Sequence, residues 1–171
     1  LTGVNVEGTG KGISMKSAVF YGKHDVRVEE YAQPEVGPED VLIQVKACGI
    51  CGTDVHIYEG DKGAAEVTPP TILGHEFSGV VVKTGADAAA DWLGKRVGVF
   101  PLIPCKICGP CQKRQYEMCR NYSYIGSRRD GAFAEYVSVP AENLIALPER
   151  VTFEEAAMLE PMAVAVHAMR R

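Results

Sequence analysis

The chain has 171 residues, which is enough for one compact domain with a core of its own. Hydrophobic residues make up 46% of the sequence and charged residues 23%, an ordinary composition for a soluble globular protein. The formal net charge of -4 argues against a broad nucleic-acid surface, and no apolar run approaches the ~20 residues that span a bilayer.

The first residues of the chain predict a leader outside the fold. Residues 1–14 lack hydrophobic periodicity and any apolar stretch of a signal peptide, so we expect a flexible leader and a cytoplasmic protein. Met15 has the position of a natural start. The Gly-rich run at 8–12 does not fit a phosphate-binding loop, because Asn5 stands where that motif needs glycine and Gly12 where it needs Ser or Thr.

From Met15 onward, short apolar or alternating runs between turn residues predict a mainly β domain. The number and spacing of these runs favour a closed or nearly closed barrel. The predicted strands cover residues 17–21, 26–31, 41–47, 77–83, 96–100, 133–139 and 144–147.

Helical patterns are few. Residues 53–58 predict one or two turns of helix. Thr152 and Glu155 have the spacing of a capping box that opens a second helix. We expect Pro161 to interrupt this helix, and residues 162–170 to begin another.

The six cysteines favour metal binding over disulfides. They fall into two close groups, whereas a disulfide framework is typically spread through a small secreted chain. Four of them lie within fifteen residues, a segment we call the four-cysteine lobe (residues 105–119). Four thiolates fill the tetrahedral shell of Zn²⁺ and leave no position for water or substrate, so this site is predicted to be structural. Its ligands are Cys105, Cys108, Cys111 and Cys119.

A second set of candidate ligands lies outside the lobe. Cysteine, histidine and glutamate occur at residues 51, 56, 75, 76 and 160. Each alone is a weak signal, because a lone histidine is more often a hydrogen-bonded core residue. Together they fit a catalytic zinc, which keeps about three protein ligands and one open position.

Several motifs then give a specific resemblance. CGICGTDVH, LGHEFSG, the four-cysteine lobe, GAFAEY and LEPMAVAVHA follow one another in the order seen in medium-chain, zinc-dependent dehydrogenases. The chain resembles their GroES-like barrel domain, and within them the polyol dehydrogenases such as sorbitol dehydrogenase. The run from PLIPC to IGSRRDGAFAEY is similar to galactitol-1-phosphate dehydrogenases, and CGTDVHIY is also similar to threonine dehydrogenase.

The resemblance implies a domain plan. Residues 15–161 would form the GroES-like catalytic domain, and 162–171 would begin the connection to a Rossmann domain that is absent here. No Gly-x-Gly-x-x-Gly motif occurs in the sequence, so NAD or NADP is implied by the resemblance alone. We expect this chain to be inactive alone and monomeric, whereas the intact enzyme is expected to form a homo-oligomer.

The resemblance also implies site residues. Cys51 and His75, with either Glu76 or Glu160, would hold the catalytic zinc, and Glu76 is also expected to take part in catalysis. Cys48 is expected to be a small buried residue outside the site.

A proton path is implied as well. Thr53 would accept the proton of the bound alcohol and His56 would pass it to solvent, a role that suits the ordinary pKa of imidazole. The expected reaction oxidises a secondary alcohol of a polyol or polyol phosphate to the ketose. A threonine 3-dehydrogenase and a non-catalytic zinc-binding module stay open as alternatives.

Two adjacent arginines bear on the substrate. Arg128 and Arg129 could bind a substrate phosphate bidentately. More often, such arginines are solvated loop residues or pair with neighbouring acids such as Asp130. We expect a small-molecule partner, and neither nucleic acid nor membrane.

Overall fold

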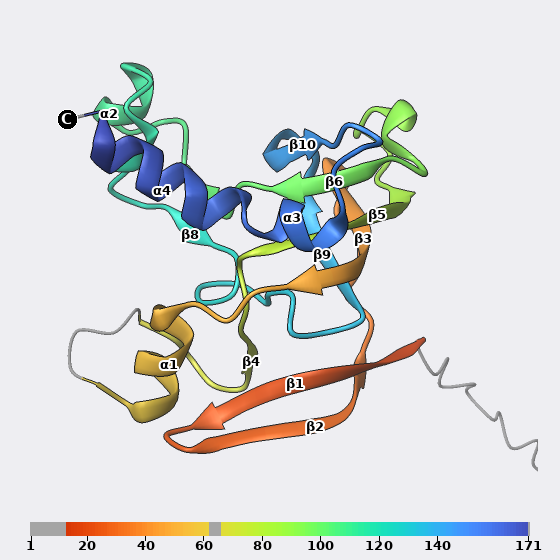
Figure 1. The fold of residues 1–171 in the computed structure, drawn as a ribbon, viewed down its shortest axis with the longest axis vertical. Helices are drawn as coiled ribbons and strands as arrows, with labels where there is room; N and C mark the ends of the chain where they lie inside the picture. Colours follow the sequence, from red (N-terminus) through yellow and green to blue (C-terminus); the bar gives the residue numbers. More distant parts are fainter. Residues whose placement is uncertain (1–12, 62–65, 171) are drawn as a thin grey trace, which may run out of the picture.

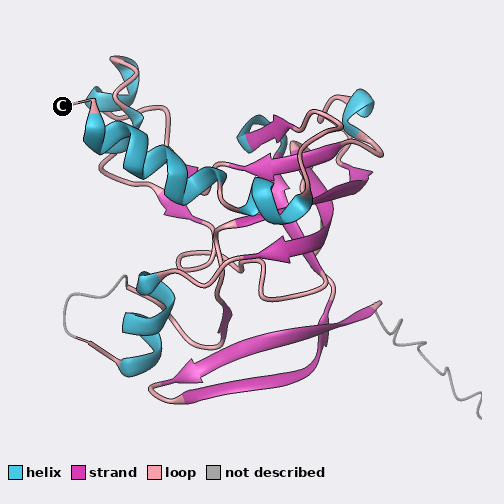
Figure 2. Ribbon diagram, viewed as in Figure 1, coloured by secondary structure: helices cyan, strands magenta, loops and turns pink. Residues whose placement is uncertain are grey.

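The computed structural model of the chain describes residues 13–61 and 66–170. Most of the predicted leader and the Gly-rich run at 8–12 lie outside the described residues, and Ser14 is already the first residue of β1. The predicted mainly β character is confirmed (Figure 2). The strands are β1 (Ser14–Gly22), β2 (Asp25–Ala32), β3 (Asp40–Cys48), β4 (Thr71–Ile72), β5 (Phe77–Thr84), β6 (Arg96–Val99), β7 (Leu102–Ile103), β8 (Ser123–Tyr124), β9 (Tyr136–Pro140) and β10 (Leu144–Ala146).

The helices are short apart from the last one (Figure 1). Three short 3-10 turns accompany them at Ala90–Trp92, Tyr116–Met118 and Ala141–Asn143. The α-helices are α1 (Gly52–Glu59), α2 (Gly109–Gln112), α3 (Phe153–Ala157) and α4 (Leu159–Met169).

The strands form three antiparallel sheets within the described residues. Five strands pair in the order β10-β6-β5-β3-β9, three in the order β2-β1-β4, and β7 pairs with β8. The segment before β9 joins the first two sheets, because Ala18 N–H donates to the Phe133 carbonyl at 2.8 Å and Glu135 N–H to the Lys16 carbonyl at 3.1 Å. The two sheets are therefore linked by backbone hydrogen bonds, while their buried side chains form separate clusters.

The main core lies against the five-stranded sheet. Alternate residues of its strands point inward, as the predicted alternation of β3 requires. Helix α3 covers β5 and β6. The start of α4 also packs on β6, because an added Cβ at Gly98 would lie 2.6 Å from the Leu159 side chain. Burial of the mostly β-branched side chains stabilises this core. The core includes Val41, Ile43, Phe77, Val81, Val97, Val99, Ile125, Val137 and Val139.

The C-terminal helices correct one prediction. The capping box is present, since Thr152 Oγ1 accepts from Glu155 N–H at 3.2 Å and Glu155 Oε2 accepts from Thr152 N–H at 2.8 Å. Pro161 does not interrupt a helix, however; the break falls at Met158, between α3 and α4. Pro161 lies in the first turn of α4, where the N–H that proline lacks has no intrahelical partner in any case.

Candidate metal centres

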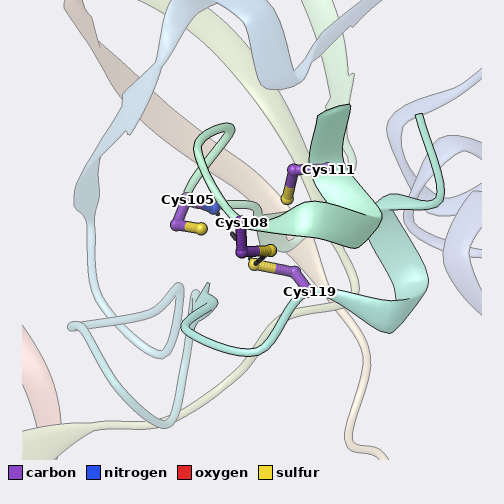
Figure 3. A group of neighbouring side chains, drawn as sticks. All are labelled: Cys105, Cys108, Cys111 and Cys119. Carbon is purple, nitrogen blue, oxygen red and sulfur yellow. Dashed lines mark hydrogen bonds between the residues drawn. The ribbon is translucent and has the colours of Figure 1, made fainter. Parts of the chain in front are cut away.

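The four-cysteine lobe brings its sulfur atoms together. The four Sγ atoms lie within 4.8 Å of one another and point toward a common centre (Figure 3). Cys111 and Cys119 are buried, whereas Cys105 and Cys108 are half-buried. This is the predicted donor set of a closed tetrahedral zinc site.

The backbone of the lobe turns tightly around these sulfur atoms. Cys108 is the N-cap of α2, and Pro110 lies in the first turn, where proline is well tolerated. Lys106 has φ 62° and Arg114 φ 59°, left-handed conformations that lead the chain into and out of α2. Local turns, rather than a core, therefore position the ligands.

Backbone donors also set the charge of the lobe. Hydrogen bonds from the N–H groups of Arg120 and Cys111 lower the pKa of Cys108 to about 6. The N–H of Cys105 donates to Cys119 Sγ at 3.2 Å and lowers the pKa of Cys119. Burial instead raises the pKa of Cys111 to about 12. Donors of this kind favour the thiolate form of cysteine, which is the soft ligand that zinc prefers.

A second group, which we call the open site, consists of Cys51, His75 and Glu76. Their ligand atoms lie within 4.8 Å of one another; His75 and Glu76 are buried and Cys51 is half-buried. Cys51 precedes α1, and the other two lie between β4 and β5. The Gly49 N–H donates to the Glu76 carbonyl at 2.7 Å and ties the two segments together. An added Cβ at Gly49 would lie 2.6 Å from Glu76 Oε2, so a side chain here would displace the Glu76 carboxylate.

The start of α1 aims Cys51 at this group. Cys51 is the N-cap, and its Sγ accepts a hydrogen bond from the Thr53 N–H at 3.5 Å. This contact at the helix N-terminus fixes the direction of the Cys51 side chain.

Asp54 is a residue of this site that sequence analysis missed. It is buried, and its Oδ2 accepts from the Cys51 N–H at 2.9 Å while its Oδ1 accepts from the Gly74 N–H at 3.3 Å. The same Oδ1 lies 3.7 Å from His75 Nδ1. Asp54 therefore holds both segments of the open site. In the sequence, the three-residue spacing between Cys51 and Asp54 is a capping-box pattern that could have pointed to this role.

A cavity of about 430 Å³ lies against the open site. Thr53 and His75 line it, so one side of the cysteine–histidine–glutamate group faces space large enough for a small molecule. The wall opposite is made by the lobe and the segment around β8. Further lining residues are Glu66, Phe100, Leu102, Glu117, Tyr122, Tyr124, Ser127 and Arg128.

Glu160 is not a member of the group of three among the described residues. Its Oε1 accepts from the Tyr124 hydroxyl at 3.4 Å, and the Tyr124 ring meets the His75 ring edge-on at a centroid distance of 5.5 Å. Burial, then the charge of Glu160, raise the pKa of Tyr124, which keeps its hydroxyl protonated as a donor. Glu76 is thus the carboxylate of the open site. Glu160 is linked to His75 through Tyr124, which contacts both residues. No sequence pattern singled out Tyr124.

Two other residues considered in the sequence are not among these three ligands. His56 is exposed on α1, and its Nδ1 lies 2.7 Å from Asp61 Oδ2. Burial, reinforced by the charges of Asp54 and Glu76, raises the pKa of Cys48 to about 12. Cys48 therefore stays a neutral thiol; it is half-buried and packs against the main core.

The two arginines have different surroundings. Arg129 Nη2 lies 2.8 Å from Asp40 Oδ2, and its side chain is half-buried away from the open site. Arg128 is exposed and lines the cavity that Thr53 and His75 share. The structure thus separates two residues that the sequence could only treat as a pair.

Comparison with known proteins identifies the family. Residues 37–149 match the family described as alcohol dehydrogenase GroES-like domain. The chain belongs to this family. The GroES-like fold expected from the motifs is therefore confirmed, as is the zinc-type medium-chain dehydrogenase family in which those motifs occur.

Named relatives of this GroES-like domain are oxidoreductases. The chain is 39% identical over 158 residues to "Probable D-xylulose reductase A" of Aspergillus terreus, covering 91% of this chain and 45% of that protein. It is 41% identical over 155 residues to the L-threonine 3-dehydrogenase of Legionella pneumophila, covering 90% and 46%. The crystal structure of galactitol-1-phosphate dehydrogenase from Escherichia coli matches with a TM-score of 0.82 and 39% identity, covering 91% and 44%. The chain thus spans a little under half the length of these proteins.

In the described part of the GroES-like domain, no helix is both long and apolar enough to cross a membrane. The paired strands there are antiparallel, without the parallel sheet of a dinucleotide-binding fold.

Proposed function

We propose that this domain binds one structural and one catalytic Zn²⁺ and serves the oxidation of a secondary alcohol of a polyol or polyol phosphate with NAD or NADP. The observation that carries the proposal is the meeting of Cys51, His75 and Glu76 beside a cavity that His75 and Thr53 line. A purely structural zinc module has no need of a second, open ligand set beside a cavity.

The donor set of the open site fits zinc. One thiolate, one imidazole and one carboxylate are common zinc ligands, and three protein ligands leave a position for a substrate oxygen. Zinc bound there supplies Lewis acidity, which lowers the pKa of a coordinated hydroxyl by several units. Asp54 would hold His75 and the backbone at Cys51 in place, as residues around a metal site commonly do.

The proton of the alcohol is assigned to side chains of α1. Thr53 lines the cavity, so its hydroxyl is placed to accept that proton. His56 follows three residues later, close to Thr53 on the helix surface, and its exposed imidazole with Asp61 can release the proton to solvent. Glu160, hydrogen-bonded by Tyr124, would accept a hydrogen bond from the substrate or a water at the cavity wall.

The hydride acceptor is assigned to a part of the protein beyond this domain. Residues 15–161 would form the catalytic domain and residues 162–171 the start of the connection to a nicotinamide-binding domain, with the complete protein a homo-oligomer. Oxidation then requires the nicotinamide to reach the cavity from that second domain.

The substrate class rests on the relatives. Two of the names, D-xylulose reductase and galactitol-1-phosphate dehydrogenase, concern polyols and their ketoses. L-threonine 3-dehydrogenase supplies the second candidate, because threonine also carries a secondary alcohol. Polyols are favoured because the cavity presents hydrogen-bonding side chains such as Glu66, Glu117 and Ser127 to several hydroxyl groups.

Metal analysis of the purified chain tests the proposal. We expect two Zn²⁺ per chain, and one after Cys51→Ser. Co²⁺ exchanged into the open site should give an absorption spectrum that responds to sorbitol or galactitol. The matched control is Cys48→Ser, which should keep both metals. A single metal held by the four-cysteine lobe, with no change on Cys51→Ser, would favour the non-catalytic module instead.

A further inference from the structure

The candidate active-site cavity has a side branch. A second cavity of about 280 Å³ shares three of its lining residues with the larger one. The branch therefore continues from the space that Thr53 and His75 line. Its walls are formed by Glu66, Thr68, Thr71, Ser127 and Arg128, of which Glu66, Ser127 and Arg128 are the shared ones.

Hydrogen-bond donors dominate the branch. Three residues carry hydroxyl groups, and two of them, Thr71 and Ser127, are only 8% and 7% exposed. Arg128 adds a guanidinium with five N–H donors. Glu66 is the one carboxylate in the branch. A group that enters here meets several donors at once.

Arg128 is held in place without being neutralised. Its Nη1 donates to the Tyr122 carbonyl at 3.0 Å, and its guanidinium carbon lies 4.3 Å from the centroid of the Tyr122 ring. Within residues 13–61 and 66–170, no carboxylate lies within ion-pair distance of Arg128, whereas Arg129 is paired with Asp40. Arg128 thus lines the branch and can offer further N–H donors to a ligand. Arg129 is already paired with Asp40.

We propose that the branch binds the phosphate group of a polyol phosphate, while a secondary hydroxyl of the same molecule lies beside Thr53 and His75. The inference rests on the proposed dehydrogenase function and narrows its substrate class. A phosphate monoester offers three acceptor oxygens to the guanidinium of Arg128 and the hydroxyls of Thr71 and Ser127. Glu66 accepts hydrogen bonds from the hydroxyl groups of the polyol chain.

Calorimetric titration of the metal-loaded 171-residue chain tests the inference. The probes are galactitol 1-phosphate, galactitol and threonine. We expect the phosphate ester to bind about tenfold or more tightly than galactitol, and Arg128→Gln to remove that difference, because hydrogen bonds to charged groups have about this effect. Arg129→Gln removes the same charge from the paired arginine and should leave the preference intact, as should Arg150→Gln at an exposed turn.

The outcomes separate this inference from the proposed function. Co²⁺ absorption in the same samples reports on the open site independently of phosphate binding. One outcome is that Co²⁺ binds while galactitol and galactitol 1-phosphate bind equally well, or while both fail to bind. Either result contradicts phosphate binding in the branch and leaves the proposed metal centre intact. If phosphate-ester binding depends on Arg128 while the open site binds no Co²⁺, the proposed dehydrogenase function is contradicted and the phosphate site is retained. An Arg128→Gln effect confined to threonine would overturn phosphate as the ligand.

Discussion

The two candidate metal centres of this domain are built in opposite ways. The four-cysteine lobe takes all its ligands from fifteen consecutive residues, and most side chains between them are exposed. The open site takes Cys51 from one segment and His75 and Glu76 from another, and a buried aspartate and the neighbouring core hold the two together. A centre without its own core depends on the metal for its order, whereas a centre embedded in a core is largely preformed.

The largest effect is expected for Cys111→Ser, which removes a buried ligand of the lobe. Structural zinc contributes about 10–16 kcal/mol to small metal-dependent folds, so residues 105–119 should lose their order together with the metal. Limited proteolysis should cleave within the lobe while circular dichroism keeps the β signal. A lobe that stays protected after metal removal would show that its turns fold without zinc.

The next largest effect is expected for Cys51→Ser at the open site. The chain should lose the second metal, but its free energy of unfolding should fall by less than about 2 kcal/mol, because hydrogen bonds and packing still hold the segment. Metal analysis measures the loss of the second metal, and thermal unfolding of the same samples measures the change in stability. Equal destabilisation by Cys51→Ser and Cys111→Ser would remove the contrast between the two centres.

Asp54→Asn should weaken metal binding at the open site by about 10–100-fold and leave the lobe unchanged, because residues that orient metal ligands have effects of this size. Competition with a chromophoric chelator measures the affinity of each site. Asp61→Asn is the matched control, since Asp61 is exposed and pairs with His56. An unchanged affinity in Asp54→Asn would mean that packing alone orients His75.

The smallest effect is expected for Tyr124→Phe, which removes one hydrogen bond to Glu160. The free energy of unfolding should fall by about 1 kcal/mol or less, with both metals retained. The spectrum of Co²⁺ in the open site should respond to galactitol at a higher concentration than in the unaltered chain. Loss of a metal from Tyr124→Phe would place Glu160 among the ligands after all.

Much of the fold followed from local patterns. The alternation at 41–47 and the capping box at Thr152 each depend on neighbours in the sequence, and the structure contains both elements. The helix break was placed wrongly at Pro161, because the pattern could not tell that proline would fall in a first turn rather than an interior one. Short elements such as β4 and β7, with two residues each, exist only through their partners and gave no signal.

By itself, the sequence determined that the four cysteines of the lobe come together, because they are close enough along the chain for spacing alone to predict a closed metal site. Only the tertiary structure brought His75 and Glu76 to Cys51, placed Asp54 behind them and set Glu160 on Tyr124. It also separated Arg128, which faces the cavity, from Arg129, which pairs with Asp40. The physical reason is that contacts between distant segments are fixed by how sheets and loops pack, and single residues in a sequence carry no record of that packing.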